Sequence, residues 1–340
     1  MSNDLDFVIR HADVVTASDR FSCDIGIRDG RVAMLGQGLP RAPRELDASG
    51  MLVLPGGVDA HCHLDQPMPD MEAARRAFIR VGFAPTPVSI QVNPDASGTA
   101  RPTGTGNVTA MLSQGYVEVL FRTTDTPLAR ELDAAMARYS GIHLTAFAVA
   151  NAAVFHHRLA GHGFRVRPLV KMQRPVETEA ASGTAAFTIA RVEPGEMPEG
   201  RIQALTHHTE QTVWQPRWLS HPNGALALTG VVIAVADVEE AAARFARFTG
   251  RAAALSQFGH TITLDRGRIE LVSGEGLQHM LPDIPIPALP FMAACEIKVA
   301  SLTRLRDMLE RAGMSVSERG QVLIVQFPPE IGQGAWLFFE

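Results

Sequence analysis

The feature that most restricts how this chain can fold is a pattern that recurs four times between residue 70 and the end. Each copy runs from a short polar residue through a helix-like segment to a glycine: Asp70 to Gly82, Asn151 to Gly163, Asp237 to Gly250, and Ser301 to Gly313. Asp, Asn and Ser are preferred N-caps because their side chains accept from the free N–H groups of the first turn. Gly suits the left-handed position at the other end. The pattern therefore predicts four helices of similar length.

Strand-like segments accompany these helices. An apolar segment precedes three of the caps, in TAFAVAN, VVIAVAD and CEIKVAS. Every copy closes with a second apolar segment that begins at glycine: GYVEVL at Gly115, GRIQAL at Gly200, GRIELV at Gly267, and GAWLFF at Gly334. The first copy has no apolar opening segment, because Pro67 and Pro69 lack the N–H that a central strand must donate. We therefore predict an α+β fold of four βαβββ modules whose first opening strand is lost or replaced.

The repeated βαβββ order resembles the vicinal oxygen chelate superfamily, which includes glyoxalase I and the extradiol dioxygenases. The stretch LTHHTEQTVWQPRWLSHPNGALALTGVVIAVAD is most similar to the glyoxalase-like subgroup. In that superfamily two modules pair into a cup-shaped sheet that holds a divalent metal. The resemblance covers residues 70–340 and implies two such cups, a first glyoxalase-like domain at 70–217 and a second at 218–340.

Residues 1–69 have a different character. Short runs rich in Val and Ile alternate with Asp, Gly and Pro, and Asp29-Gly30 predicts a hairpin. The segments DGRVAMLG and DASGMLVLPGGVDAHCHLDQP resemble the start of the cyclic amidohydrolases of the hydantoinase and dihydropyrimidinase group. The resemblance implies a small β-rich unit followed by the first strand of a (β/α)8 barrel. We therefore predict a fusion whose seam lies at residues 69–71.

His61 and His63 match the two-histidine metal motif of that amidohydrolase group. A spacing of two places both imidazoles on one face of a strand. A hydrolytic two-metal centre also needs ligands from later strands of a complete barrel. The two lysines, Lys171 and Lys298, do not lie in the sequence context of the family's lysine ligand. The favoured interpretation is a remnant segment without a working hydrolytic centre.

The vicinal oxygen chelate resemblance places metal ligands on the opening and closing strands. On the closing strands the matched positions are Glu118, Gln203, Glu270 and Leu337. Alternation puts Gln203, Leu205 and His207 on one face and His208 on the other. In the second cup, Glu270 and His260 are the available donors, and we expect that cup to act as support or as an apolar pocket.

In the first cup, the resemblance implies a metal site built from Glu118, His143 and His207, with His63 as a fourth ligand. This donor set suits Zn, Fe, Mn or Ni. Glu118 is then either a ligand or the catalytic base, while Gln203, Trp214 and Trp218 are candidates for contacting the substrate. The competing interpretation is that Glu118 is a solvated strand residue and that His207 is structural, bonded to the loop of the two tryptophans.

Composition excludes several classes of function. The net charge of -5 comes without any basic block, which argues against nucleic acid as a partner. No run of about 18 uncharged apolar residues occurs, and the first residues lack the features of a signal peptide. The three cysteines are far apart, as is typical of a reducing compartment. These observations predict a cytoplasmic protein without a membrane partner, whose partner is a small molecule; assembly into a homo-oligomer stays open.

Three functions therefore compete. The leading one is a metal-dependent enzyme acting on a small molecule with vicinal oxygens, of lyase, isomerase or dioxygenase type. The second is a non-catalytic protein of the same fold that binds a small apolar or aromatic ligand. The third is a hydrolase of cyclic amides that uses His61 and His63.

Overall fold

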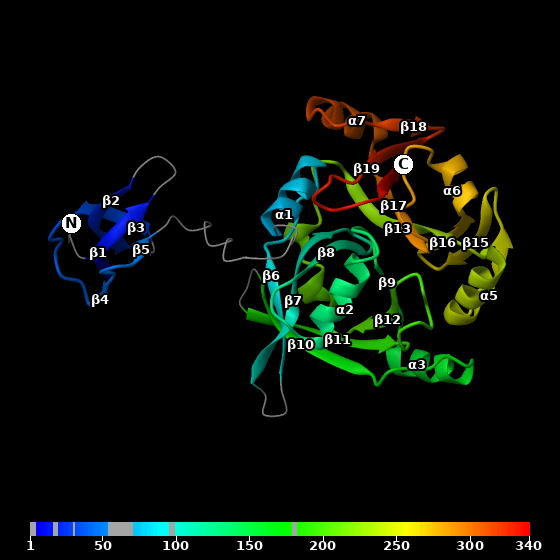
Figure 1. Cartoon of the computed structure of the whole chain (residues 1–340), viewed down its shortest axis with the longest axis horizontal. Helices are drawn as coiled ribbons and strands as arrows, with labels where there is room; N and C mark the ends of the chain where they lie inside the picture. Colours follow the sequence, from blue (N-terminus) through cyan, green and yellow to red (C-terminus); the bar gives the residue numbers. More distant parts are fainter. Residues whose placement is uncertain (1–4, 16–19, 30, 54–70, 95–98, 179–181) are drawn as a thin grey trace. The chain divides into compact units, whose positions relative to one another are not determined.

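The computed structural model describes residues 5–15, 20–29, 31–53, 71–94, 99–178 and 182–340. The chain divides into two compact units, Met1–Pro67 and Met68–Glu340 (Figure 1). Among the described residues, no helix has the length and apolar character needed to cross a membrane.

The N-terminal unit is a small sheet with strand order β3-β2-β1-β4, in which β5 also pairs with β1. Its strands are β1 (Phe7–Val15), β2 (Arg20–Arg28), β3 (Arg31–Gly36), β4 (Arg44–Asp47) and β5 (Leu52–Val53). The predicted hairpin is confirmed, because β2 and β3 are antiparallel and Arg28 pairs with Arg31. Asp29 at the turn has a φ of 51°, in the left-handed region that the hairpin requires.

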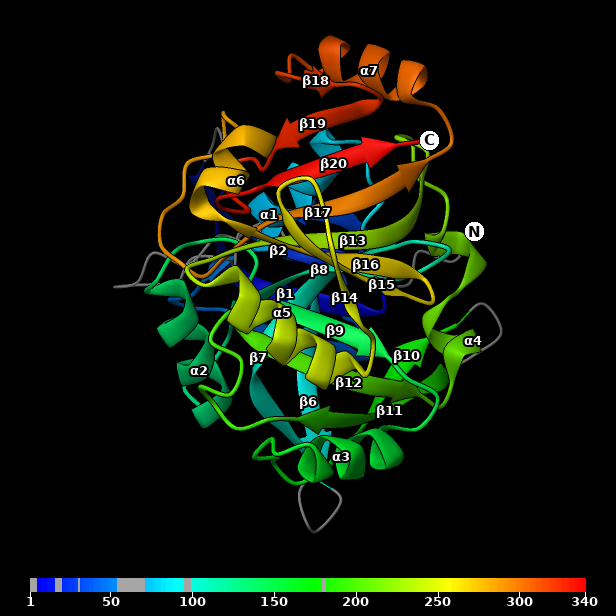
Figure 2. The same cartoon turned by 90° about the vertical axis from the view of Figure 1, so that its right-hand side faces the viewer.

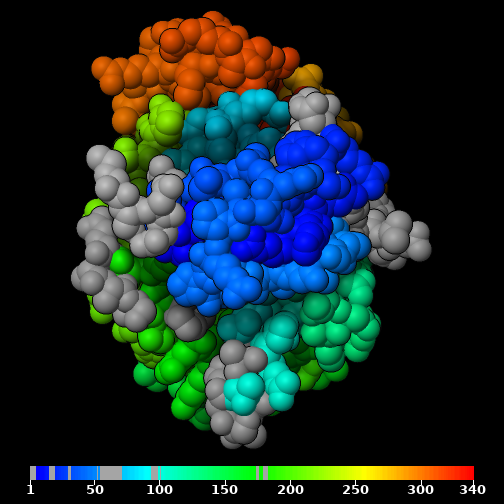
Figure 3. Space-filling model, turned by 90° about the vertical axis from the view of Figure 1, so that its left-hand side faces the viewer, coloured from blue at the N-terminus to red at the C-terminus, as the bar shows by residue number. Residues whose placement is uncertain are grey.

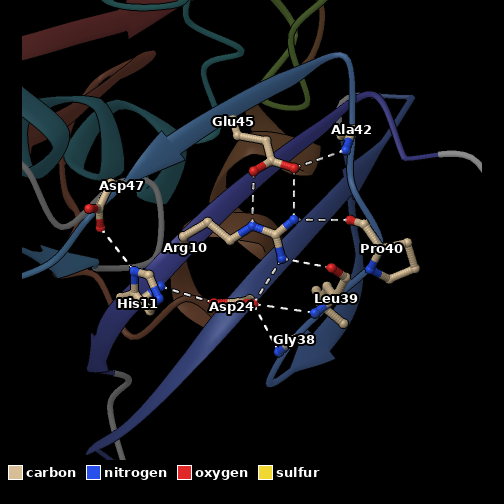
Figure 4. Close-up of polar contacts among 9 residues, drawn as sticks. All are labelled: Arg10, His11, Asp24, Gly38, Leu39, Pro40, Ala42, Glu45 and Asp47. Carbon is tan, nitrogen blue, oxygen red and sulfur yellow. Dashed lines mark hydrogen bonds and ion pairs between the residues drawn. The ribbon is translucent and has the colours of Figure 1, made fainter.

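Arg10 ties this unit together (Figure 4). Its guanidinium donates to the Asp24 carboxylate at 3.0 Å and to both carboxylate oxygens of Glu45 at 2.7 and 3.2 Å. It also donates to the carbonyls of Leu39 and Pro40 at 2.7 and 3.2 Å. All five N–H donors of the arginine therefore have acceptors. The bond to Asp24 links β1 to β2, and the bonds to Glu45 link β1 to β4.

One face of the N-terminal sheet is packed and carries five buried side chains: Ala12, Val14, Cys23, Ile25 and Ala48. Several large apolar side chains of the same unit are exposed instead, including Val32 at 62% and Leu35 at 55%. Figure 3 shows this unit in blue. The unit thus has a small core, and Leu5 and Val8 are buried in addition to these side chains.

The C-terminal unit contains three sheets. A three-stranded sheet has the order β6-β7-β8, from strands β6 (Ser89–Pro94), β7 (Ala100–Met111) and β8 (Tyr116–Arg122). A four-stranded sheet has the order β10-β11-β12-β9, from strands β9 (Leu144–Ala148), β10 (Val170–Glu177), β11 (Ser182–Arg191) and β12 (Arg201–His207).

The third sheet has eight strands in the order β14-β15-β16-β13-β17-β20-β19-β18, and Figure 2 shows its central strands side by side. Its strands are β13 (Ala225–Val235), β14 (Ala253–Leu255), β15 (Gly259–Leu264), β16 (Gly267–Ser273), β17 (Phe291–Val299), β18 (Ser317–Arg319), β19 (Val322–Gln326) and β20 (Ala335–Phe339). The strand before each helix pairs in parallel with the last strand after it, as in β13 with β16 and β17 with β20. The pair β9 and β12 follows the same rule in the four-stranded sheet.

The four repeated helices lie where the sequence predicts them. They are α1 (Met71–Arg80), α3 (Ala152–Gly161), α5 (Val238–Thr249) and α7 (Leu302–Arg311). The side chains of Asn151, Asp237 and Ser301 accept from backbone N–H groups of the first turn. The four predicted glycines have φ between 68° and 83°, as the left-handed ends of the helices require. The first predicted cap, Asp70, lies outside the described residues.

Other helices follow the strands and were not predicted. They are α2 (Pro127–Met136), α4 (Glu210–Val213), α6 (Gly274–Met280) and the short 3-10 helix η2 (Pro216–Trp218). Thr126 caps α2, and Pro127 occupies its first position, which are ordinary start signals.

Two hydrophobic cores join segments that are far apart in the sequence. In the first, Phe78 of α1 and Phe121 of β8 pack with Trp336 of β20 and Leu309 of α7. The second joins β12 and the end of α3 to β13, α5 and β16. The two smaller sheets therefore pack in these cores through their outer faces. Their inner faces remain to line a cavity.

Candidate functional site

A cavity of about 1880 Å³ lies in the C-terminal unit. Side chains from the three-stranded sheet, the four-stranded sheet and α2 supply much of its lining. Alternate residues of β7 and β11 line it, because successive side chains of a strand point to opposite faces. Most residues of β12 line it as well.

A polar stripe on β7 forms one wall of the cavity. It consists of Thr103, Thr105, Asn107 and Thr109, and the last three are buried. Thr105 donates to the Gln91 side chain on β6 at 2.6 Å. The segment PTGTGN, whose glycines would suit a loop, lies within β7. Its signal as a strand is the strict alternation of polar residues with Gly, Val and Ala from residue 103 to residue 110.

Glu118 faces the same cavity. On β8 it lies directly opposite Thr109, and residues paired in this way point to one face of the sheet. The Asn107 amide donates a hydrogen bond to its carboxylate. The structure thus places the predicted residue at the cavity surface, in a polar setting where a carboxylate can accept hydrogen bonds or exchange a proton with a bound molecule.

The second wall is the inner face of β11 and β12. Gln203, Leu205 and His207 all line the cavity, and Ile202 and Thr206 of the same strand line it too. His208 points away, is exposed and contacts the Thr188 hydroxyl at 2.8 Å. Gln203 is buried and its carbonyl accepts from the Arg191 Nε at 3.0 Å.

Aromatic side chains surround His207 at one end of this wall. Its ring lies 4.7 Å from Trp214, 5.1 Å from Phe187 and 6.2 Å from Tyr116, measured between centroids. Burial lowers the pKa of His207, and its buried Nε2 has no hydrogen-bond partner among the described residues. The predicted bond between His207 and the tryptophan loop is not formed: the Trp214 indole donates to the Leu112 carbonyl at 3.0 Å instead.

Trp218 also lines the cavity and is half-buried. The Arg217 guanidinium lies 4.9 Å from its ring centroid. The two tryptophans predicted to contact a substrate are therefore both at the cavity surface.

His143 has a separate set of neighbours. It is buried just before β9, its Nε2 contacts the Tyr139 carbonyl at 2.7 Å, and its ring lies 4.0 Å from the Tyr139 ring. Burial lowers its pKa. Tyr139 in turn packs on Phe291 of β17. His143 nevertheless lines the same cavity as Glu118 and His207.

The described residues do not fit one metal ion held jointly by Glu118, His143 and His207. They contain no group of three His, Cys, Asp or Glu side chains that could hold a metal ion. The buried Nδ1 of His143 and Nε2 of His207 lack partners in this part of the chain, but they lie in different surroundings. The other predicted ligands, His61 and His63, lie outside the described residues.

Charged residues around Glu131 of α2 were missed at the sequence level. They are Arg167, Arg191, Glu193 and Arg201, and all of them line the cavity. No local motif marks this group, because its members come from α2, from two strands and from the loops beside them.

The eight-stranded sheet contributes Val231, Arg268 and Cys295 to the cavity lining, while the other face of its central strands is covered by its own side chains. Leu277 of α6, together with Leu281 and Ile284 after it, packs there against Val232 and Leu337 in one buried core. Glu270 is buried and accepts from the Ser256 hydroxyl. Its strand partner is Thr261, so His260, one residue away, points to the other face.

Comparisons with known proteins bear on both units. The model of a family described as "Glyoxalase-like domain" matches residues 63–249, so the matched segment begins at His63. D-hydantoinase from Geobacillus stearothermophilus is 43% identical over 61 residues, which are 18% of this chain and 13% of that protein. An allantoinase from Solibacter usitatus is 43% identical over 60 residues, with the same shares. The chain therefore spans only about an eighth of the length of these curated relatives.

Among solved structures, a hypothetical protein from Staphylococcus aureus gives a TM-score of 0.49 at 10% identity, covering 73% of this chain and 90% of that one. A mutant of 4-hydroxymandelate synthase from Streptomyces coelicolor gives 0.47 at 14% identity, covering 79% and 88%.

The glyoxalase-like match includes the polar stripe of β7, Glu118 and the whole inner face of β11 and β12. It extends over more than half of the 340 residues. The chain therefore belongs to the glyoxalase-like domain family.

Proposed function

We propose that this protein binds a small organic molecule in the cavity between the three-stranded and four-stranded sheets. The observation that carries the proposal is the cavity itself, which has a polar wall with Glu118 on one side and an apolar and aromatic wall on the other. Small-molecule sites commonly combine apolar walls with a few placed polar groups. The corresponding face of the eight-stranded sheet is filled by its own side chains.

The architecture that goes with this proposal is two cups. In it, residues 70–217 form the first glyoxalase-like domain and residues 218–340 the second, each made of two βαβββ modules. Support comes from the shared strand order, in which the strand before a helix pairs with the last strand after it. The first module departs from this order among the described residues, where β8 pairs with β7 alone.

A ligand-observed NMR screen of small organic fragments tests the binding function. Ala146 pairs with Gln203 across β9 and β12, so its side chain shares the cavity face. The Ala146→Phe variant is expected to fill this space and abolish the fragment signals. Ala153 on α3 is exposed, and the Ala153→Phe variant should bind as the wild type does. Equal binding by Ala146→Phe and wild type would contradict the proposal.

A metal-dependent enzyme acting on vicinal oxygens is the second candidate. Two observations favour it: Glu118 faces the cavity, and the family match begins at His63. In this alternative Glu118 is a ligand or the base, and a further ligand comes from outside the described residues. Elemental analysis of protein purified without a metal-binding tag separates the candidates. One equivalent of Zn, Fe, Mn or Ni, lost in both Glu118→Gln and His63→Gln, would establish the second candidate in place of the first.

A further inference from the structure

Three arginines surround the Glu131 carboxylate at one end of the cavity. Arg167 donates to its Oε1 at 2.9 Å, and Arg201 donates to its Oε2 at 3.2 Å. Arg167 also contacts Glu193 at 3.3 Å. Arg191 is the third cation, and no described carboxylate forms an ion pair with it.

Arg191 is held in place by a neutral group. It lies opposite Gln203 in the β11–β12 register, and its Nε donates to the Gln203 carbonyl. This bond leaves the two Nη groups without an acceptor among the described residues. Burial, together with the neighbouring cations Arg201 and Arg167, lowers the pKa of Arg191 to about 10 against the opposing effect of Glu131. A partly buried guanidinium without an ion-pair partner is costly. A bound anion beside Arg191 would offset that cost.

The other charged group to be weighed is Glu118. Its carboxylate acts on Arg201 across the cavity but is not among the groups that act on Arg191. Glu131 is the carboxylate that acts on Arg191, and it already accepts hydrogen bonds from Arg167 and Arg201.

The same wall becomes apolar away from Arg191. Ile189 and Leu205 are directly paired, and both line the cavity. Beyond them Phe187 pairs with His207, where the aromatic side chains gather. His207 lies four positions after Gln203 on the strand, so their Cα atoms are roughly 13 Å apart. A bound molecule would thus meet a cationic end and an aromatic end within the length of a small organic acid.

We propose that Arg191 binds the carboxylate of an amphipathic organic acid, whose apolar body lies along Ile189 and Leu205 toward His207. This inference rests on the proposed binding function of the cavity. The two Nη groups of an arginine match a carboxylate in a paired geometry, and Gln203 fixes the orientation of the guanidinium.

Isothermal titration with a panel of C4 to C9 phenylalkyl and alkyl monocarboxylates and their primary amides tests the inference. For at least one pair, the acid should bind the wild type 10-fold or more tightly than the amide. The Arg191→Met variant should lose that preference while keeping the affinity for the amide. Arg165 is exposed, pairs with Glu196 and lies away from the cavity, so Arg165→Met should keep the preference.

The ligand-free variant supplies an independent measurement. Because Arg191 is a partly buried cation without an ion-pair partner, Arg191→Met should raise the melting temperature by roughly 2 °C or more. A lowered melting temperature together with an unchanged preference for acids would show a structural role and overturn the inference. If acids and amides bind the wild type equally, the proposed binding function is supported and the anion site at Arg191 is ruled out. If no compound of the panel binds, both fall.

Discussion

At the scale of single residues, Glu118 and His143 differ in their position relative to a strand, and this position decides which groups surround each side chain. Both were predicted from the repeat, but only Glu118 has a strand partner whose side chain, Thr109, is known to face the cavity. His143 precedes its strand, and its ring packs on Tyr139. Both residues line the cavity, but alternation predicts the neighbours of a side chain only inside a strand, and His143 lies outside β9.

A pH dependence of stability follows from His143 and His221, which are buried, and from His207, which is half-buried. Burial lowers the pKa of His143, His207 and His221. In the unfolded chain a histidine binds its proton near pH 6.5, whereas these groups resist protonation in the folded state. The unfolded state therefore binds more protons as the pH falls below about 6.5, and the free energy of unfolding decreases there.

Melting temperatures measured between pH 7.5 and 5 check this expectation. The wild type should lose stability below about pH 6.5, and His143→Gln should show a shallower slope. The exposed His157 serves as control, and His157→Gln should follow the wild type. A flat profile for the wild type across this range would contradict the expected effect of burial.

At the scale of elements, local signals predicted more than long-range ones. The N-cap and the terminal glycine of α3, α5 and α7 lie about a dozen residues apart in each case, so both signals are local. Both are confirmed. α2 carried its own signals, Thr126 and Pro127, and could have been found. α6 and the residues after it cover one face of the eight-stranded sheet. This arrangement depends on tertiary packing, which no local sequence pattern predicts. The arginines around Glu131 depend on strand register in the same way.

The contact between the loop before β12 and α5 is a second long-range feature. Arg244 of α5 donates to both carboxylate oxygens of Glu199 at 2.7 and 2.8 Å, and both side chains are buried. Burial lowers the pKa of Arg244, but its hydrogen bonds to Glu199 and Glu240 outweigh that effect and raise the pKa. Breaking a buried pair leaves a buried charge unpaired, which costs about 3 to 5 kcal/mol.

Urea unfolding of Glu199→Gln checks this estimate. The free energy of unfolding should fall by about 3 kcal/mol, since Glu240 still pairs with Arg244 and holds part of its charge. The exposed pair of Arg251 and Asp265 is the matched control. Asp265→Asn should change the free energy by less than about 1 kcal/mol. A loss of the same size in both variants would show that the buried pair contributes no more than a surface pair.

At the scale of the whole molecule, the chain joins two unequal parts. A unit of about 67 residues precedes the unit Met68–Glu340, of which the part up to residue 249 matches the glyoxalase-like family. The similarity to D-hydantoinase covers only 61 residues, a small part of that enzyme. A cyclic amidohydrolase assembles its centre from several strands of a complete barrel, which a segment of this size does not contain.

We therefore expect no ring opening of hydantoin or dihydropyrimidine by the full chain. Incubation of the purified protein with either compound and added Zn or Mn, followed by chromatography of the products, measures this. Turnover that disappears in both His61→Ala and His63→Ala would contradict the expectation and restore the amidohydrolase interpretation.

The central claim, that the cavity between the two smaller sheets is the functional site, is tested most directly by a crystal structure of the protein with the tightest-binding fragment. The account predicts that the ligand contacts Leu205 and the polar stripe of β7, with any anionic group at Arg191. A ligand bound instead on the N-terminal sheet, or on the face of the eight-stranded sheet covered by α6, would contradict it.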